Sequence, residues 1–398
     1  MFLLEQYHNV NPNLVCKSGG KQMLVHYDKK KLTTENATEL SIYRSVVFNS
    51  KKELVSFSPP KSVPFQTFKE EFSCDSSCIE EFIDGTMINM FYDNEWCIST
   101  KTNIGANCRF YNDAPTFKDL FYDTMKCCGV TVDDFDPQVS YSFVLQHPLI
   151  RIVTPVVPAL YLVSAYTIER AISDTSKNFV HELNVHELVL PKTILFPKRF
   201  KHDSYEQPFA FHDWKFKGYM FKNNHVRSKL MNPDYVKVKE LRNNQPKLKY
   251  HYLTVRNYPD KKATFLIFYP ELSDKFKEYG LEIDLFTTEL YNHYQNCFIK
   301  KTALLSTFPY KFKKHMYALH GMYLASRVNT SMNAVKKYVS SLHPSVLMHT
   351  LNCGHLFPPK DGELKKSLDK VADIVAEPNA MNFLPNLQTI DIPEKNCD

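Results

Sequence analysis

The hydrophobic pattern of this chain changes near residue 270, and this change restricts the fold more than any other feature. Before it, short runs of β-branched and aromatic residues predict strands at 45–49, 53–58, 86–92, 95–100, 141–146 and 218–222. Beyond it, apolar residues recur at helical spacing, first at Phe312, Met316, Leu319 and Tyr323 and then at Met332, Val335, Val339 and Leu342. The sequence therefore predicts an α+β chain, in which a strand-rich domain precedes a helical domain.

A chain of 398 residues is long enough for two or three domains. We place a first domain at 1–262, a helical domain at 263–377 and an extended tail at 378–398. Residues 86–99 predict a hairpin that turns at Asp93-Asn94, and residues 116–125 predict a helix. The most apolar segment, 152–168, contains two prolines and is too short to span a membrane, so we expect two strands there and no membrane partner.

Positive charge is concentrated in one part of the chain. The whole sequence has 49 lysines and arginines against 43 acids, a net charge of +6. Residues 191–262 contain 17 of these cations and 6 of the acids, which leaves a net charge of −5 for all other residues. This asymmetry favours an anionic partner at one site, although a solvated loop region would also explain it.

The ten cysteines show no regular spacing, which predicts reduced thiols in a cytosol-like compartment. The first six residues lack the basic and apolar regions of a signal peptide. Cys74, Cys78, Cys127 and Cys128 could offer thiolates to zinc. No second cysteine or histidine knuckle follows them, so we expect ordinary cysteines and assign no metal ligands.

Five groups of short motifs follow one another along the chain, and their order as a set indicates more than any single motif does. They are 43–48 with 55–62, 82–88 with 99–104, 142–148 with 151–153, 217–220, and 226–229 with 232–235. Together they resemble the phage tRNA-repair type of ATP-dependent RNA ligase, in the version carried by large DNA viruses. The resemblance covers roughly residues 40–350, and the family belongs to the covalent nucleotidyltransferase superfamily.

The resemblance implies a nucleotidyltransferase domain, ATP-grasp-like and built from antiparallel sheets, followed by an all-helical domain. In this family a lysine attacks the α-phosphate of ATP, and the adenylate then passes to an RNA 5′-phosphate. Acidic residues hold the ribose and a magnesium ion. The resemblance therefore implies ATP and magnesium as cofactors, RNA as a partner, and a location in the host cytoplasm, a virus factory or the virion.

Several cationic and turn residues match the family's motifs. We assign nucleotide binding to Arg44, Asp84, Gly85, Arg151, Arg227 and Lys229 on this basis, and we take Lys61 and Lys101 as candidate catalytic lysines. Each cation taken singly could belong to a solvated strand face, and Asp84-Gly85 could be a simple turn.

Three residues depart from the family at the reactive centre. Phe82 stands at the position of the nucleophile, and Val144 and Lys217 stand where acids are expected. The resemblance therefore implies that self-adenylation is either lost, which would make the chain a pseudoenzyme that binds RNA ends, or rebuilt on Lys61 or Lys101. An active RNA ligase with a relocated lysine and a structural or virion component that reuses the fold both remain open.

One further segment, 241–252, alternates cations with aromatic residues. Bases can stack on tyrosine and histidine while lysine and arginine contact phosphates. This pattern predicts RNA binding by Arg242, Lys247, Lys249 and Tyr250. The same segment could instead be a buried linker between the two domains.

Overall fold

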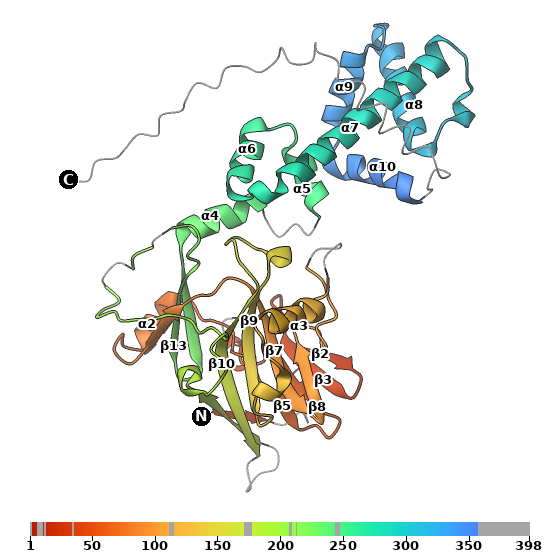
Figure 1. Ribbon diagram of the computed structural model, residues 1–398. Helices are drawn as coiled ribbons and strands as arrows, with labels where there is room; N and C mark the ends of the chain where they lie inside the picture. Colours follow the sequence, from red (N-terminus) through yellow and green to blue (C-terminus); the bar gives the residue numbers. More distant parts are fainter. Residues whose placement is uncertain are drawn as a thin grey trace, which may run out of the picture. The chain divides into compact units, whose positions relative to one another are not determined.

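The computed structural model describes residues 2–5, 11, 13–33, 36–110, 115–170, 177–206, 209–211, 213–242 and 247–356. The chain divides into two compact units, 1–247 and 248–398 (Figure 1). This division falls before the expected boundary at 262, because helix α5 (Leu248–Val255) packs against other helices of the second unit. These are α6 (Pro259–Phe268), α7 (Ser273–Tyr294) and α10 (Pro344–Leu356). The expected tail at 378–398 lies outside the described residues.

Three antiparallel sheets form the first unit. The largest has the strand order β1-β11-β10-β9-β7-β8 and contains β1 (Phe2–Glu5), β7 (Thr86–Asp93), β8 (Glu95–Ser99), β9 (Val139–Gln146), β10 (Ala159–Arg170) and β11 (Lys177–Leu183). A second sheet, β12-β6-β13-β14, contains β6 (Cys78–Glu81), β12 (Arg199–Phe200), β13 (Gly218–Asn223) and β14 (Val226–Met231). The third, β2-β3-β4-β5, contains β2 (Leu14–Gly19), β3 (Gln22–Tyr27), β4 (Val46–Phe48) and β5 (Leu54–Ser56). Antiparallel sheets are thus confirmed.

Most of the strands predicted from the sequence are present within one or two residues. The predicted hairpin is β7 and β8, and Asn94 at its turn has a positive φ of 61°. The predicted helix is α3 (Phe117–Cys127), which begins with a capping box between Thr116 and Asp119. The prediction of two strands within 152–168 was wrong, since this stretch holds a single strand, β10, which begins at Ala159 and continues to Arg170. Pro155 and Pro158 precede β10 and cannot donate to a sheet.

Short helices cover the sheets of the first unit (Figure 1). On the six-stranded sheet, α3 buries Phe117, Leu120 and Phe121 against strand residues such as Phe143. On the second sheet, α2 (Phe65–Glu71) buries Phe68 against Phe221. Two other α-helices lie in the described part of this unit, α1 (Ala37–Leu40) and α4 (Pro233–Arg242).

Two motif glycines are required by the backbone. Gly85 has a φ of +145°, and a Cβ there would lie 2.5 Å from the carbonyl oxygen of Leu145. Gly218 has a φ of +139°, and its Cβ would lie 2.1 Å from the oxygen of Leu230. The glycines of these two motifs therefore allow close strand contacts, whatever else the motifs do.

The second unit is helical in its described part, as predicted. The two apolar stripes lie on α8 (Tyr310–Ser326) and α9 (Met332–Ser341), where Phe312, Met316, Leu319, Val335 and Val339 are buried. His315 is buried among them, with its ring nitrogens 2.8 Å from Tyr338 Oη and 2.9 Å from Thr350 Oγ1. Over the described ranges of both units, no helix is long and apolar enough to cross a membrane.

Candidate functional site

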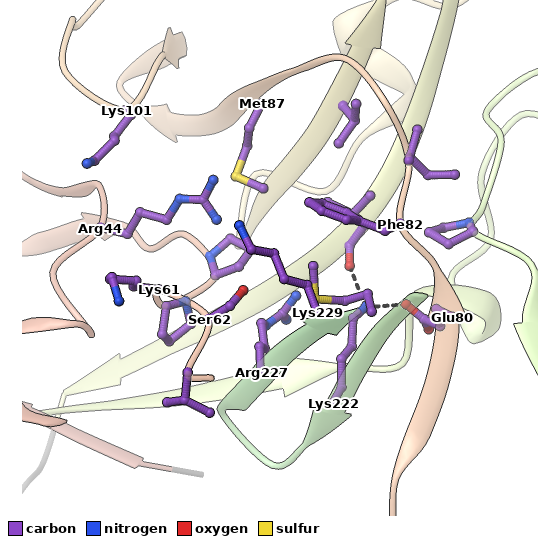
Figure 2. Close-up of a pocket in the computed structure, with 18 of the residues that line it drawn as sticks. Arg44, Lys61, Ser62, Glu80, Phe82, Met87, Lys101, Lys222, Arg227 and Lys229 are labelled. Carbon is purple, nitrogen blue, oxygen red and sulfur yellow. Dashed lines mark hydrogen bonds and ion pairs between the residues drawn. The ribbon is translucent and has the colours of Figure 1, made fainter. Parts of the chain in front are cut away.

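A cavity of about 500 Å³ lies in the first unit and is lined by residues from all three sheets (Figure 2). Strand β3 contributes Tyr27, β9 and β10 contribute Val144 and Val163, and β6, β13 and β14 contribute two residues each. The segment 59–64, which contains three of the unit's prolines, completes the wall. Residues far apart in the sequence therefore meet here.

Hydrogen bonds bring the motif segments to this wall. The Phe82 N–H donates to the carbonyl of Gly218 at 2.8 Å, which joins the second and fourth motif groups. The Val63 N–H donates to the carbonyl of Arg227 at 2.8 Å, which joins the segment of Lys61 to β14. The Ser45 hydroxyl donates to the carbonyl of Thr100 at 3.2 Å, which places Arg44 and Lys101 on neighbouring segments.

Five cations line this cavity without forming an ion pair to a carboxylate anywhere in the described part of the chain. We call them the cation cluster: Lys29, Arg44, Lys61, Lys101 and Lys229. In Figure 2, Lys101, Arg44 and Lys61 lie on the side of the cavity opposite Phe82, and Lys229 lies between. Four of these five, all except Lys29, were predicted as site residues.

The electrostatics of the cluster reflect crowding of like charges. Burial, followed by the charges of Lys29, Arg44 and Lys61, lowers the pKa of Lys101 to about 8. Burial and nearby cations, among them Lys239, also lower the pKa of Lys229. The Lys101 ammonium lies 3.9 Å from the centre of the Tyr27 ring, a cation–π contact that partly offsets its desolvation. An anion with several charges would stabilise this arrangement.

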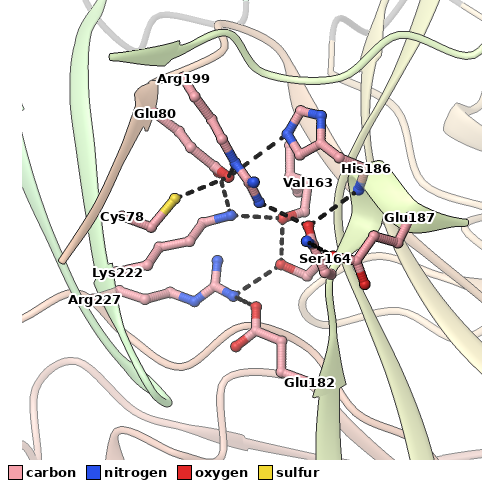
Figure 3. A network of polar contacts seen from close by, with 11 residues as sticks. Cys78, Glu80, Val163, Ser164, Glu182, His186, Glu187, Arg199, Lys222 and Arg227 are labelled. Carbon is pink, nitrogen blue, oxygen red and sulfur yellow. Dashed lines mark hydrogen bonds and ion pairs between the residues drawn. The ribbon is translucent and has the colours of Figure 1, made fainter. Parts of the chain in front are cut away.

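Two further cations of the wall are fixed by internal contacts (Figure 3). Lys222 is paired with Glu80 and donates to the carbonyl of Val163 at 2.9 Å. Arg227 is paired with Glu182 and donates to Ser164 Oγ at 2.9 Å and to Tyr166 Oη at 3.1 Å. Arg227 is only 4% exposed, and its buried Nε–H has no hydrogen-bond partner among the described residues.

The three positions where the sequence departs from the family lie close together. Phe82 and Val144 both line the cavity, so the site has no amine or acid at these two positions. The Lys217 ammonium lies 3.9 Å from the centre of the Phe82 ring, and that of Lys229 lies 5.9 Å from it. Lys217 is not part of the cavity wall; it donates to the carbonyl of Ile83 at 3.0 Å, and burial lowers its pKa to about 8.

Asp84, Gly85 and Arg151 lie outside the cavity wall. Asp84 is buried, and its carboxylate accepts bonds from the Val153 and Thr154 N–H groups and from Tyr235 Oη. Arg151 is buried too and donates from Nε to the carbonyl of Val153 at 2.9 Å. These residues hold together the segments beside the cavity, a role that their motif positions did not reveal.

The segment predicted to bind RNA is divided between the units. Arg242 and Lys247 belong to the first unit, and Lys249 and Tyr250 belong to the second. Arg242 donates to the carbonyl of Arg151 at 3.2 Å, and the Lys249 ammonium lies 2.6 Å from a carboxylate oxygen of Glu282. RNA binding by these four residues stays a prediction.

Sequence reasoning missed Lys29 and the fixed pair of Lys222 and Glu80. Lys29 lies two residues beyond the end of β3, a strand that we did not predict. Lys222 could have been found from the alternation in β13, where Tyr219 and Phe221 are buried against the aromatic core and Met220 and Lys222 line the cavity.

The cysteines considered for zinc, Cys74, Cys78, Cys127 and Cys128, are free thiols. Burial raises the pKa of three of them, Cys74, Cys78 and Cys128, which keeps these thiols protonated near neutral pH.

Comparison of the sequence with protein-family models and with curated proteins gave no match.

Proposed function

We propose that the first unit is an RNA-ligase-like nucleotidyltransferase module that binds a nucleotide or a phosphorylated RNA end in the cavity, and that it has lost self-adenylation at position 82. The observation that carries this proposal is the convergence of the cation cluster on the cavity that Phe82 borders. Phosphate groups are the ligands that such a set of amines and a guanidinium recognises best.

The size and charge of the cavity support a binding role. Its volume of about 500 Å³ falls in the range typical of small-molecule sites. A structural or virion component would need no such opening, and it would gain stability from packing Phe82 into the space with apolar neighbours. The open basic cavity therefore favours a binding module over a purely structural use of the fold.

The loss of self-adenylation follows from the chemistry of three side chains. Phenylalanine has no lone pair with which to attack an α-phosphate, and Val144 offers no oxygen to a metal ion. Lys217, at the other acidic position, is a cation that contacts the Phe82 ring. The side chains of this site therefore favour nucleotide binding, and they do not favour the covalent transfer of adenylate to position 82.

Charge reversal at Lys229 tests the binding role. Although Lys229 is partly desolvated by its neighbours, its side chain still reaches solvent at the cavity, so Lys229→Glu should fold normally. It should weaken ATP binding at least about tenfold, since one charge-assisted bond is worth roughly 1.5–3 kcal/mol. The measurement is isothermal titration calorimetry of the full chain with ATP at low ionic strength. The matched control is Lys118→Glu, on the exposed surface of α3, which should leave the affinity unchanged. Equal affinities for both variants would contradict the assignment of this cavity.

A second candidate function is an active RNA ligase that uses Lys101. Its favouring observation is the pKa of about 8, which leaves about a tenth of the amine neutral at pH 7. In that reaction Lys101 Nζ would form a bond to the α-phosphorus of ATP, pyrophosphate would leave, and the amine proton would pass to solvent. This candidate differs from the first by one product, a covalent protein adenylate.

A further inference from the structure

The carboxylates around the cavity are poorly suited to magnesium, the metal that the family resemblance implies. Magnesium prefers oxygen ligands in near-octahedral geometry, usually with one or two free carboxylates. Within the described ranges, no group of three histidine, cysteine, aspartate or glutamate side chains could hold a metal ion. We infer that this cavity binds its polyphosphate without a divalent metal, and that the cation cluster neutralises the charge instead; the inference rests on the proposed function.

Two carboxylates near the cavity, Glu80 and Asp84, are already committed to lysine partners, and a third, Glu182, is committed to Arg227. Glu80 is paired with Lys222 and lies 3.5 Å from Arg199 Nε, and although burial opposes it, these charges lower the pKa of Glu80. Asp84 accepts three hydrogen bonds and lies 3.6 Å from the Lys217 ammonium. Binding a metal at either carboxylate would leave a buried lysine without its counter-charge.

Glu81 lines the cavity together with Glu80. Burial raises its pKa, which disfavours the charged form that a metal needs. Its backbone N–H donates to the carbonyl of Lys198 at 2.8 Å, and the lysine charge lies nearby. A single half-buried carboxylate of this kind is a weak magnesium site.

The cations, in contrast, are numerous and available. All five members of the cation cluster line the wall without a carboxylate partner among the described residues, and the buried Arg227 Nε–H adds a donor that has no partner there. A magnesium ion placed on the phosphates would be repelled by these groups. It would also neutralise part of the charge to which they are attracted, so the metal-free polyphosphate is the better ligand.

Calorimetry of the full chain tests this inference with three probes: ATP, inorganic tripolyphosphate and a short RNA that carries a 5′-triphosphate. Each is titrated once in EDTA and once in excess magnesium chloride at matched ionic strength. We expect binding in EDTA that is equal to, or several-fold tighter than, binding in magnesium, because of the greater charge of the free polyphosphate. The probe that binds most tightly in EDTA identifies the source of the phosphates.

The outcomes separate the inference from the function on which it rests. Binding that requires magnesium would overturn the inference and leave the proposed function standing. Absence of binding for every probe in both buffers would overturn both. Glu81→Gln supplies a second readout: it should bind ATP in EDTA as wild type does, and a loss of binding confined to magnesium would identify Glu81 as a metal ligand and contradict the inference.

Discussion

Lys101→Met is expected to make the protein more stable and to make it bind ATP more weakly. The wild-type side chain holds an ammonium group in a partly buried position among Lys29, Arg44 and Lys61, which lowers its pKa to about 8. Methionine fills a similar volume without that charge. After allowance for solvent screening, we expect a gain of about 1–2 kcal/mol in the free energy of unfolding at pH 7, with at least about a tenfold loss of ATP affinity.

The pH dependence of this gain follows from the pKa of Lys101. The pKa is about 8 in the folded protein and has its ordinary value of 10.5 in the unfolded chain. Between these values the unfolded chain binds the proton and the folded chain does not, so the wild type gains stability as the pH rises. The advantage of Lys101→Met should therefore be full below pH 8 and shrink towards pH 10.5.

Urea unfolding monitored by tryptophan fluorescence measures the stability of the first unit, because both tryptophans, Trp96 and Trp214, lie in it. Lys118→Met, a change at an exposed lysine of α3, is the matched control and should alter neither stability nor ATP affinity. If Lys101→Met lost stability and kept its affinity for ATP, the cluster would be a structural feature and the binding assignment would be contradicted.

Asp84→Ala is expected to destabilise the first unit by about 3–5 kcal/mol, the size typical of removing one member of a buried charged pair. Asp84 is 6% exposed, and its carboxylate accepts hydrogen bonds from the N–H groups of Val153 and Thr154 and from the hydroxyl of Tyr235 on α4. The buried Lys217 ammonium, 3.6 Å away, would lose its counter-charge. We expect the midpoint of urea unfolding, again from tryptophan fluorescence, to fall accordingly.

Two comparisons keep the Asp84 prediction testable. Asp84→Asn retains an acceptor for Tyr235 and should cost less than Asp84→Ala, so it gives a value if the alanine variant does not fold. Asp234→Ala removes an exposed aspartate that is paired at 2.8 Å with Lys237, and it should cost less than about 1 kcal/mol. A cost for Asp84→Ala as small as that of Asp234→Ala would show that the carboxylate does not hold these segments together.

The strand and helix pattern could be predicted because it depends on local sequence. The stripes on α8 and α9 and the hairpin of β7 and β8 each have a period or a turn that a short window contains. The failure within 152–168 depended on tertiary structure, because Pro155 and Pro158 lie just before β10 and cannot donate to its neighbouring strands. The division of the chain after residue 247 also depends on tertiary contacts, those of α5 with α7 and α10.

The candidate site was predicted in part for the same reason. The resemblance selected Arg44, Lys61, Lys101 and Lys229, which the fold brings together at one cavity. The resemblance could not show that Asp84 and Arg151 lie outside the cavity wall, because a motif gives a position in the chain and not the direction of a side chain. Lys29 joins the cluster only through the packing of β3, which no motif marks.

The measurement that tests the account most directly uses ATP radiolabelled at its α-phosphate. Full-length protein is equilibrated with this ATP by dialysis, once with magnesium and once with EDTA, and each sample is then denatured and separated by gel electrophoresis. We predict label bound to the native protein and no label on the denatured chain, because Phe82 supplies no nucleophile and Lys101 acts as a binding cation. A label that survives denaturation and disappears in Lys101→Ala would contradict this account and establish an active nucleotidyltransferase.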